Sequence, residues 1–387
     1  MRFEFATANR IVFGPGSLST ALEDPTAHGR RALVVTGRSP GRAEPLLSLL
    51  QALGVSCTIY PVSGEPTTTL VEDGVRRSRQ ARCEMVFGIG GGSVIDAGKA
   101  IAALLTNPGT LFDYLEVIGE GRSLPHPAAP YTAVPTTAGT GAEVTRNAVL
   151  TSPVHRVKVS LRSPYMLPRL AVVDPELTRS MPPPVTAATG MDALTQCLEA
   201  YVSRKANPLT DSLSRDGLRR CGRSLRSAFR DGQNLAARTD MALASLFSGL
   251  ALANGGLGAV HGIAGPLGGR VAAPHGVLCG RLLPSVLAVN LQRLQTESDS
   301  GKAAKRFDEV AQLLTGHPAA IAADGISWLR DLVRELNLPP LTAFGLAPDD
   351  LPTVAAGALK ASSMQGNPVP LSEKDILSIL EAALVPD

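Results

Sequence analysis

The sequence predicts a protein of two domains, an α/β domain with a parallel sheet over residues 1–180 and an all-helical domain over residues 181–387. The chain of 387 residues is longer than one ordinary core, because domains cluster at roughly 100 to 150 residues. Up to about residue 180, short β-branched apolar runs alternate with helix-length segments, which indicates a parallel sheet. Beyond residue 181 the apolar spacing becomes helical, so the second domain is expected to contain helices alone.

The expected elements follow from the spacing of apolar residues along the chain. Residues 3–18 alternate like an edge hairpin that ends in a Gly-Pro-Gly turn. Strands are predicted at five short apolar runs, residues 31–36, 57–62, 85–89, 131–134 and 170–173. Helical periodicity covers residues 307–314 and 326–336. Ser372 followed by Asp375 predicts a capping box that opens the last helix.

The composition is that of a folded globular protein and does not suggest a nucleic-acid-binding or membrane protein. Apolar residues make up 44% of the chain, charged residues make up 18%, and the net charge is only +3. The arginines of residues 215–230 alternate with apolar residues at helical spacing, which is typical of a solvated helix face. Because no signal core opens the sequence and no apolar stretch approaches about 20 residues, we expect a soluble protein.

The cysteines give a hint of the cellular compartment. The chain has five of them, an odd number, and no two form a CxxC pair. This pattern argues against a disulfide framework and against a thiolate zinc site. A reducing, cytoplasmic location is therefore expected.

A glycine loop follows the predicted strand at residues 85–89. The strand runs into Gly90, Gly91, Gly92 and Ser93, and the next residues place their apolar side chains on one helical face. Bare backbone at a helix N-terminus suits a pyrophosphate, because the free N–H groups and the helix dipole stabilise negative charge. The loop matches neither the full dinucleotide fingerprint nor a P-loop, so an ordinary strand-to-helix turn remains an alternative.

A second polar loop, residues 134–145, carries four threonines among small residues. Hydroxyl groups and bare backbone suit ribose and phosphate oxygens, although local turns by themselves also favour threonine. Two such loops at the carboxyl ends of strands favour a ligand crevice.

Together with residues 189–195 (TGMDALT) and 258–261 (GAVH), these loops resemble the iron-containing (group III) alcohol dehydrogenase family, over essentially the whole chain. The resemblance implies a Rossmann-like dinucleotide-binding domain, an all-helical second domain as in dehydroquinate synthase, and catalysis in the cleft between them. It also implies an oxidoreductase that transfers a hydride between NAD(P) and a small alcohol, aldehyde or keto compound. Members commonly form dimers or larger homo-oligomers, so a homo-oligomer is expected.

The resemblance assigns the cofactor-binding residues by motif. It places the pyrophosphate at the glycine loop, the nicotinamide end at the threonine loop and a ribose hydroxyl near a lysine, through Gly90, Gly91, Gly92, Ser93, Asp96, Thr136, Thr137, Thr140 and Lys158. NAD-preferring relatives carry an acidic residue after the first strand, where this chain has Gly37, Arg38 and later Arg42. Guanidinium groups without a carboxylate favour the 2′-phosphate of NADP over NAD, unless this segment is only a turn.

The resemblance also implies a divalent metal, held by an aspartate and three histidines. Asp192, His261 and His275 match three of these ligands, but Gln196 stands where the histidine one helical turn after the aspartate is expected. A neutral amide oxygen is a weaker ligand than imidazole for iron or zinc. The remaining three ligands can still hold ferrous iron or zinc with open positions.

Other interpretations remain open at this point. One is a metal-independent reductase similar to maleylacetate reductases, in which His261 or His275 protonates the substrate oxygen. Another is a dinucleotide-binding protein that has lost catalysis, and a third is a lyase of the dehydroquinate synthase type. Gly265 replaces a further substrate-site histidine of the family, so a larger or anionic substrate would be admitted, and Arg270 could pair with its carboxylate or lie at the surface.

Overall fold

The computed structural model describes residues 2–22, 25–155, 157–296 and 301–384. The chain forms two compact units. The first, which we call the α/β unit, comprises Ala6–Thr137 and Gly141–Thr178. The second, which we call the helical unit, comprises Arg179–Asp387 together with Met1–Phe5 and Ala138–Thr140. A short piece of the threonine-rich loop therefore belongs to the helical unit.

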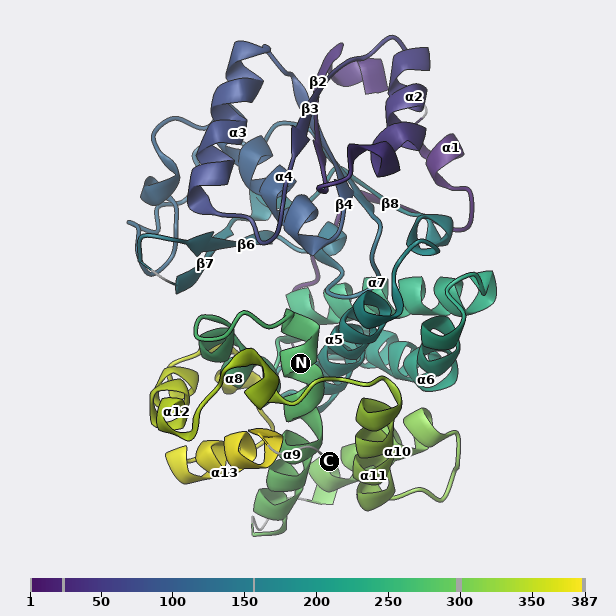
Figure 1. Ribbon diagram of the computed structural model, residues 1–387, viewed down its shortest axis with the longest axis vertical. Helices are drawn as coiled ribbons and strands as arrows, with labels where there is room; N and C mark the ends of the chain where they lie inside the picture. The colour runs from purple at the N-terminus through teal and green to yellow at the C-terminus, as the bar shows by residue number, and fades with distance from the viewer. Residues whose placement is uncertain (1, 23–24, 156, 297–300, 385–387) are drawn as a thin grey trace. The chain divides into compact units, whose positions relative to one another are not determined.

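A six-stranded parallel sheet forms the centre of the α/β unit (Figure 1). Its order is β1-β8-β5-β4-β2-β3, with β1 Arg10–Phe13, β2 Arg31–Thr36, β3 Ser56–Pro61, β4 Met85–Gly90, β5 Tyr131–Pro135 and β8 Leu170–Val173. All five apolar runs predicted as strands belong to this sheet. The predicted edge hairpin is wrong, because β1 is a single strand that pairs in parallel with β8. The open edge of β8 satisfies the backbone of β1, so no second strand before it is required.

Helices cover both faces of this sheet (Figure 1). Leu33 and Val35 of β2 pack with α3 (Thr68–Gln80) and α4 (Gly92–Thr106), whereas the alternate residues of the strand pack with α1 (Leu18–Ala21) and α2 (Glu44–Ala52). Successive side chains of a strand point to opposite faces, so a strand covered on both sides must be apolar throughout. The uninterrupted run RALVVT reflects this double burial.

A second, two-stranded sheet was not predicted. It consists of β6 (Asn147–Ser152) and β7 (Val157–Arg162), which pair antiparallel and pack against α4. Only alternate residues of β6 are buried, which is typical of a sheet with one covered face.

The helical unit is built around α5 (Pro183–Val202), which contacts α6, α7 and α9. Its other helices are α6 Pro208–Arg230, α7 Leu235–Gly255, α8 Ala259–Gly268, α9 His275–Gln295, α10 Gly301–Thr315, α11 Ala322–Glu335, α12 Leu351–Leu359 and α13 Glu373–Leu384. The two predicted helical segments are α10 and α11. The predicted capping box is confirmed, since Ser372 N donates to Asp375 Oδ2 (2.8 Å) and Asp375 N donates to Ser372 Oγ (3.3 Å). An α/β class with an all-helical second part is therefore confirmed.

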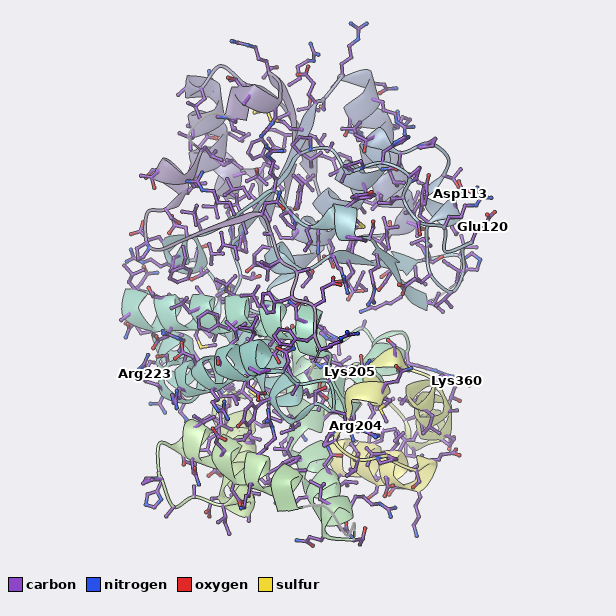
Figure 2. The ribbon with its side chains drawn as sticks, turned by 180° about the vertical axis from the view of Figure 1, so that it is seen from behind. Asp113, Glu120, Arg204, Lys205, Arg223 and Lys360 are labelled. Carbon is purple, nitrogen blue, oxygen red and sulfur yellow. The ribbon has the colours of Figure 1, made fainter. Side chains whose placement is uncertain are left out.

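The basic run on α6 is less solvated than predicted. Arg220 and Arg223 both pair with Asp240 of α7, each at 2.7 Å, and Arg226 pairs with Glu335 of α11 at 2.9 Å. Arg223, labelled in Figure 2, is exposed, but the side chain of Arg220 is only 22% exposed. These arginines tie α6 to its neighbouring helices.

Helix α7 is long and apolar enough to cross a membrane by length and composition alone. Most of it is buried within the helical unit. Its Arg238 is 0% exposed and donates hydrogen bonds to Gly232 O (3.0 Å), Thr186 Oγ1 (2.8 Å) and Met181 O (3.2 Å). A charged residue held in this way is typical of the core helix of a globular unit.

Candidate metal centre and nucleotide loops

Helix α5 presents three polar side chains on one buried face. Asp192, Gln196 and Glu199 stand at positions i, i+4 and i+7, which place them along the same side of a helix. They are 4%, 1% and 3% exposed. Thr140 Oγ1 donates to Asp192 Oδ2 (2.7 Å), so the threonine that was predicted to line the cofactor holds this carboxylate within the helical unit.

Two buried oxygens of this face have no hydrogen-bond partner within the described residues, namely Asp192 Oδ1 and Gln196 Oε1. Leaving a buried acceptor unpaired costs about 1–3 kcal/mol. Native proteins keep few such atoms without a reason, and a bound ligand or ion is one such reason. The face of α5 is therefore incomplete as a purely structural element.

Helices α8 and α9 complete the cluster. His261 Nε2 lies 3.4 Å from Asp192 Oδ1, and His275 Nε2 lies 3.8 Å from the same oxygen. Cys279, one turn after His275 on α9, places its Sγ 3.7 Å from His261 Nε2 and 3.5 Å from His275 Nε2. One ligand atom from each of these four residues lies within 4.8 Å of all the others. The structure thus brings together the predicted ligands Asp192, His261 and His275, places Gln196 one turn from Asp192 on α5, and adds a cysteine that the sequence analysis missed.

Glu199 fixes the orientation of one histidine. Its Oε2 lies 2.5 Å from His261 Nδ1, while its Oε1 accepts from Val260 N (2.6 Å). A carboxylate at Nδ1 holds the proton on that nitrogen and leaves the Nε2 lone pair facing Asp192 and Cys279. This arrangement is typical of a metal-binding histidine. Sequence reasoning missed Glu199, although its position two turns after Asp192 was a usable signal.

The electrostatics of the cluster call for positive charge at its centre. Burial would raise the pKa of Asp192, but the nearby His261 and His275 lower it to about 2. Burial likewise raises the pKa of the Cys279 thiol, yet the two imidazoles lower it overall. The neighbouring Cys279 raises the pKa of His275. The anionic side chains are therefore balanced either by protons on the imidazoles or by a cation.

The donor set fits a divalent metal ion. At zinc bond lengths of ~2.0–2.3 Å and tetrahedral angles, ligand atoms lie about 3.4 Å apart for oxygen and nitrogen and about 3.6 Å apart for nitrogen and sulfur. The observed distances are close to these values. Asp192 Oδ1 lies 3.4 Å from His261 Nε2 and 3.8 Å from His275 Nε2, and Cys279 Sγ lies 3.7 and 3.5 Å from the same two nitrogens. A cation at the centre would also satisfy the unpaired Asp192 Oδ1.

The α/β unit gathers the predicted nucleotide loops at one edge of its sheet. Strands β2, β4 and β5 are adjacent and parallel, so Gly37, Gly91 and Thr136 all follow neighbouring carboxyl ends. The strand order reverses between β2 and β4, the position where ligands bind in open α/β sheets. No side chain caps α4, whose N-cap is Gly91, so its first N–H groups are left for an anion.

The remaining predicted cofactor residues differ in their surroundings. Gly92 and Ser93 open α4, and the side chain of Thr137 lies 3.4 Å from where a Cβ on Gly91 would stand. In contrast, Asp96 accepts from Val149 N (3.1 Å) and pairs with Lys99 (2.9 Å).

Lys158 and Arg38 form a second contrast among these residues. Lys158 pairs with Glu65 at 2.6 Å. Arg38 is exposed and makes no ion pair within the described residues, and a Cβ on Gly37 would meet only open space. Arg38 therefore remains available to a ligand, whereas Lys158 already has a partner.

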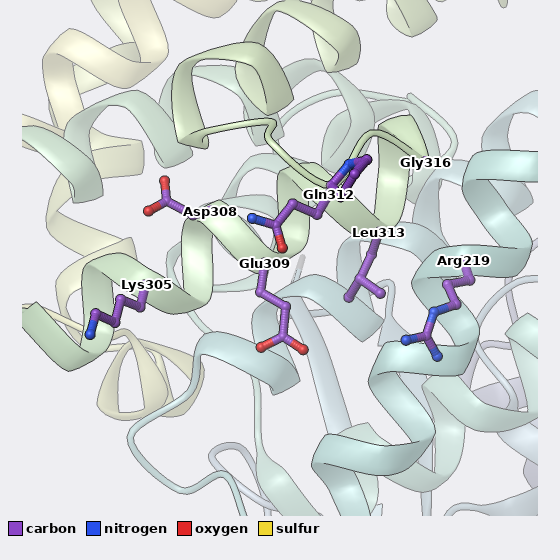
Figure 3. A pocket seen from close by; sticks show the side chains of 8 residues that line it. Arg219, Lys305, Asp308, Glu309, Gln312, Leu313 and Gly316 are labelled. Carbon is purple, nitrogen blue, oxygen red and sulfur yellow. The ribbon is translucent and has the colours of Figure 1, made fainter.

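Two surface pockets lie away from all these residues. One of about 680 Å³ lies along α10 and is lined by Lys305, Glu309 and Gln312 together with Arg219 of α6 (Figure 3). The other, of about 430 Å³, includes Met85 and Pro130 and lies at the amino edge of the sheet, opposite the glycine loop. Neither pocket contains a predicted site residue.

Comparison with known proteins covers both units. Residues 8–175 match the family model described as iron-containing alcohol dehydrogenase, and residues 186–384 match the C-terminal model of the Fe-containing alcohol dehydrogenase family. The chain is 36% identical to the 1,3-propanediol dehydrogenase of Klebsiella pneumoniae over 394 residues, which covers 98% of each protein.

Solved structures agree with this similarity. A crystal structure of 1,3-propanediol oxidoreductase has a TM-score of 0.92 and 35% identity, covering 99% of this chain and 100% of that one. The sulfoacetaldehyde reductase of Bifidobacterium kashiwanohense, solved in complex with NAD⁺, has a TM-score of 0.89 and 27% identity, and each chain is covered fully.

Proposed function

The chain belongs to the iron-containing alcohol dehydrogenase family and is an oxidoreductase of alcohols, and from this premise we propose that it transfers a hydride reversibly between NADP or NAD and a small alcohol, aldehyde or keto compound. The observation that carries this proposal is the cluster around Asp192, whose buried Oδ1 has no hydrogen-bond partner among the described residues although two imidazoles and a thiol surround it. A dinucleotide-binding protein without catalysis would have no use for such an incomplete cluster.

The α/β unit would bind the cofactor. Its pyrophosphate would lie on the uncapped first turn of α4, held by backbone groups of Gly90, Gly91, Gly92 and Ser93. Thr136 and Thr137 offer hydroxyls beside that turn, and Thr136 N donates to Gly90 O (2.8 Å), which fixes the two loops to each other. The bound nicotinamide supplies or accepts the hydride.

Asp192, His261 and His275 would hold a divalent metal, which when bound supplies a Lewis acid that stabilises negative charge on the substrate oxygen. Thr140 and Glu199 act as positioning residues, because each hydrogen-bonds one of these ligands. Burial of Asp192 and His261 lowers the local dielectric constant, which strengthens electrostatic interactions there. Gln196 contributes a neutral amide oxygen on the same face of α5.

For the cofactor, we propose a preference for NADP over NAD. Gly37 leaves open space after β2, and Arg38 and Arg42 are exposed and carry no ion pair within the described residues. Free guanidinium groups suit a 2′-phosphate, whereas a carboxylate at this point suits a ribose diol. Gly37→Asp should lower the ratio of NADPH to NADH affinity about 10-fold, measured by fluorescence titration. An unchanged ratio of NADPH to NADH affinity would show that Gly37 and its neighbours do not determine the cofactor preference.

A metal-independent reductase is a second candidate, supported by one contrast between the histidines. The side chain of His275 is 39% exposed, whereas that of His261 is 8% exposed and tied to Glu199. The raised pKa of His275 would let it protonate the substrate oxygen while hydride reaches the carbon. Activity that survives complete metal removal would favour this candidate.

The decisive experiment measures nicotinamide absorbance with NADPH and NADH against a panel of aldehydes, keto acids and alcohols. The assay is run on protein purified without added metal, after chelation, and after reconstitution with zinc or ferrous iron. We expect turnover with at least one acceptor that falls on chelation and returns with metal. Cofactor binding without turnover under any condition would refute the enzymatic proposal.

We also propose that the protein works in the cytoplasm as a homo-oligomer. All five cysteines are free, as expected in a reducing compartment. Light scattering of the purified protein would test the oligomeric state, and a monomer at working concentrations would refute it.

A further inference from the structure

We propose that the thiolate of Cys279 is the fourth protein ligand of the metal, in the place that Gln196 leaves unfilled, and that this ligand set favours zinc over ferrous iron. The inference rests on the proposed function, because it specifies the metal of the same site. It would make this chain a zinc-selective member of a family named for iron.

The first support is geometric. Cys279 Sγ is buried and faces both metal-side imidazole nitrogens, at 3.7 Å from His261 Nε2 and 3.5 Å from His275 Nε2. Asp192 is 4% exposed, and its Oδ1, which lies in the same group, has no hydrogen-bond partner within the described residues. Four of the six separations among these atoms are close to those of a tetrahedral zinc site, and all six are within 4.8 Å.

The second support is the symmetry of the two helices that carry the cluster. On α5, Asp192 and Gln196 are one turn apart, and on α9, His275 and Cys279 are one turn apart. Each helix thus presents a pair of side chains at i and i+4 to the same centre. The pair on α5 carries an amide in its second position, whereas the pair on α9 carries a thiol. A strong ligand is therefore lost on one helix and gained on the other.

The third support is charge. Zinc with Asp192, His261, His275 and the Cys279 thiolate forms a neutral unit, because one carboxylate and one thiolate balance two positive charges. With Gln196 as the fourth ligand, zinc and its ligands would keep one positive charge, which only Glu199 behind His261 would balance. On zinc binding the S–H bond of Cys279 breaks, a zinc–sulfur bond forms and the proton leaves to solvent.

Zinc selectivity follows from the sulfur. Thiolates are soft ligands that favour zinc over harder ions, whereas carboxylate and imidazole alone discriminate less. Gln196 Oε1, freed from the metal, stays buried as an unpaired acceptor. It can accept a hydrogen bond from the hydroxyl of an alcohol substrate. With Cys279 as the metal ligand, position 196 would therefore contact the substrate instead of the metal.

The main test replaces zinc by cobalt(II) in the full-length protein and records its absorption spectrum. We expect visible bands of tetrahedral cobalt together with a near-ultraviolet charge-transfer band from a thiolate. In Cys279→Ser the charge-transfer band should be lost while visible bands remain. The matched control is Cys197→Ser, another buried helical cysteine whose Sγ contacts Ala244 O and not the cluster. This control should keep both features.

The outcomes separate the two proposals. Visible bands without a charge-transfer band in the wild type would overturn Cys279 ligation and leave the metal-dependent function standing. No uptake of cobalt or zinc would overturn both Cys279 ligation and the metal-dependent form of the proposed function. If Cys279→Ser does not fold, the wild-type spectrum still decides, because no other cysteine of the described residues belongs to the cluster.

A ligand exchange provides an independent check. Cys279→Ser should weaken zinc binding at least about 100-fold in competition with a chromophoric chelator. Adding Gln196→His to this variant should restore zinc affinity to within about 10-fold of the wild type, and should lower the ratio of zinc to ferrous iron affinity. Equal zinc affinity of Cys279→Ser and the wild type would overturn the inference.

Discussion

Each unit contains a buried cluster of charged groups, and the two clusters differ in how completely their atoms are paired. In the α/β unit, Lys99 is 1% exposed, and its ammonium donates to three protein oxygens and pairs with a carboxylate. The partners are Ala142 O and Thr145 Oγ1, both at 2.9 Å, Asn147 O, and Asp96 Oδ1 at 2.9 Å. Every donor of this ammonium has an acceptor.

The cluster of the helical unit is the opposite case. Asp192 Oδ1 and Gln196 Oε1 lack partners, although they are as deeply buried as Lys99. A buried charge with all its hydrogen bonds made contributes to the stability of the fold. Unpaired buried acceptors beside converging ligand atoms instead suggest a binding site. The comparison predicts that substitutions in the first cluster change stability, and that substitutions in the second change metal content and turnover.

The largest effect is expected for Asp192→Asn. The change keeps the shape but removes the carboxylate shared by both histidines, so we expect kcat/KM to fall about 1000-fold, or about 4 kcal/mol, together with metal content. Thermal stability of the metal-free protein should change little, because Asn keeps an oxygen for Thr140 and Asp192 Oδ1 has no hydrogen-bond partner within the described residues. Steady-state kinetics and elemental analysis check this, with the exposed Asp349→Asn as control. Unchanged metal content and turnover would show that the Asp192 cluster is not a metal site.

The converse is expected for Lys99→Met. Removing the ammonium leaves Asp96 and two carbonyl oxygens without their partner, so the free energy of unfolding should fall by about 3 kcal/mol. Metal content of the folded protein should not change. Urea unfolding measures the effect. Lys158→Met, which breaks a more exposed pair with Glu65, should cost less than about 1 kcal/mol. An equal loss of unfolding free energy in Lys99→Met and Lys158→Met would contradict the structural role assigned to the buried Lys99 cluster.

The pH dependence of stability should reveal Glu143, a buried carboxyl near Lys99. Burial raises its pKa to about 7, although Lys99 opposes the shift. The folded state therefore keeps a proton that the unfolded state loses above its ordinary pKa of 4.5, so stability should fall as pH rises from 4.5 to 7. Glu143→Gln should remove this decline and gain up to about 3 kcal/mol over the wild type at high pH.

Thermal melts of the wild type and Glu143→Gln across this pH range provide the measurement. Glu120, which is exposed and labelled in Figure 2, provides the matched control. The stability of Glu120→Gln should depend on pH in the same way as that of the wild type. Parallel curves for Glu143→Gln and the wild type would show that the folded state ionises this carboxyl normally.

The smallest effect is expected for Glu199→Gln. The amide oxygen can still accept from Val260 N, but the amide NH2 then faces His261 Nδ1 and favours a proton on Nε2, the nitrogen that would bind the metal. Zinc affinity should fall about 10- to 100-fold, the usual range for a partner behind a ligand, with no loss of thermal stability of the metal-free protein. Chelator competition measures this, and Glu373→Gln at the exposed start of α13 serves as control. An unchanged zinc affinity would remove Glu199 from the metal site.

Much of the fold was predictable because local periodicity reports burial. The strands at residues 31–36 and 85–89 are covered on both faces, so their apolar runs stand out from the rest of the sequence. The β6–β7 sheet was missed because it is covered on one face only, and short alternating segments are hard to tell from loops. The error at residues 3–18 arose because alternation does not reveal which edge a strand will join, and β1 joined β8 in parallel.

The site was predictable in part, through spacing and resemblance. Asp192, Gln196, His261 and His275 were identified from motifs, but Cys279 was overlooked because cysteines were sought in CxxC pairs. Its position four residues after His275 places both on one face of α9, and this signal was present. Glu199 was similarly visible at i+7 from Asp192.

The sequence by itself determined the order of strands and helices, the uncapped glycine turn before α4 and the pairs of polar residues on α5 and α9, because each depends on neighbours a few residues away. Only the tertiary structure decided that α5, α8 and α9 converge, that Thr140 contacts Asp192, and that Cys279 completes the cluster. These contacts join residues far apart in the chain: Cys279 and His261 are 18 positions apart, Thr140 and Asp192 are 52 apart, and Glu199 and His261 are 62 apart. Helical spacing fixes which residues share a face, whereas packing of the apolar faces fixes which faces meet.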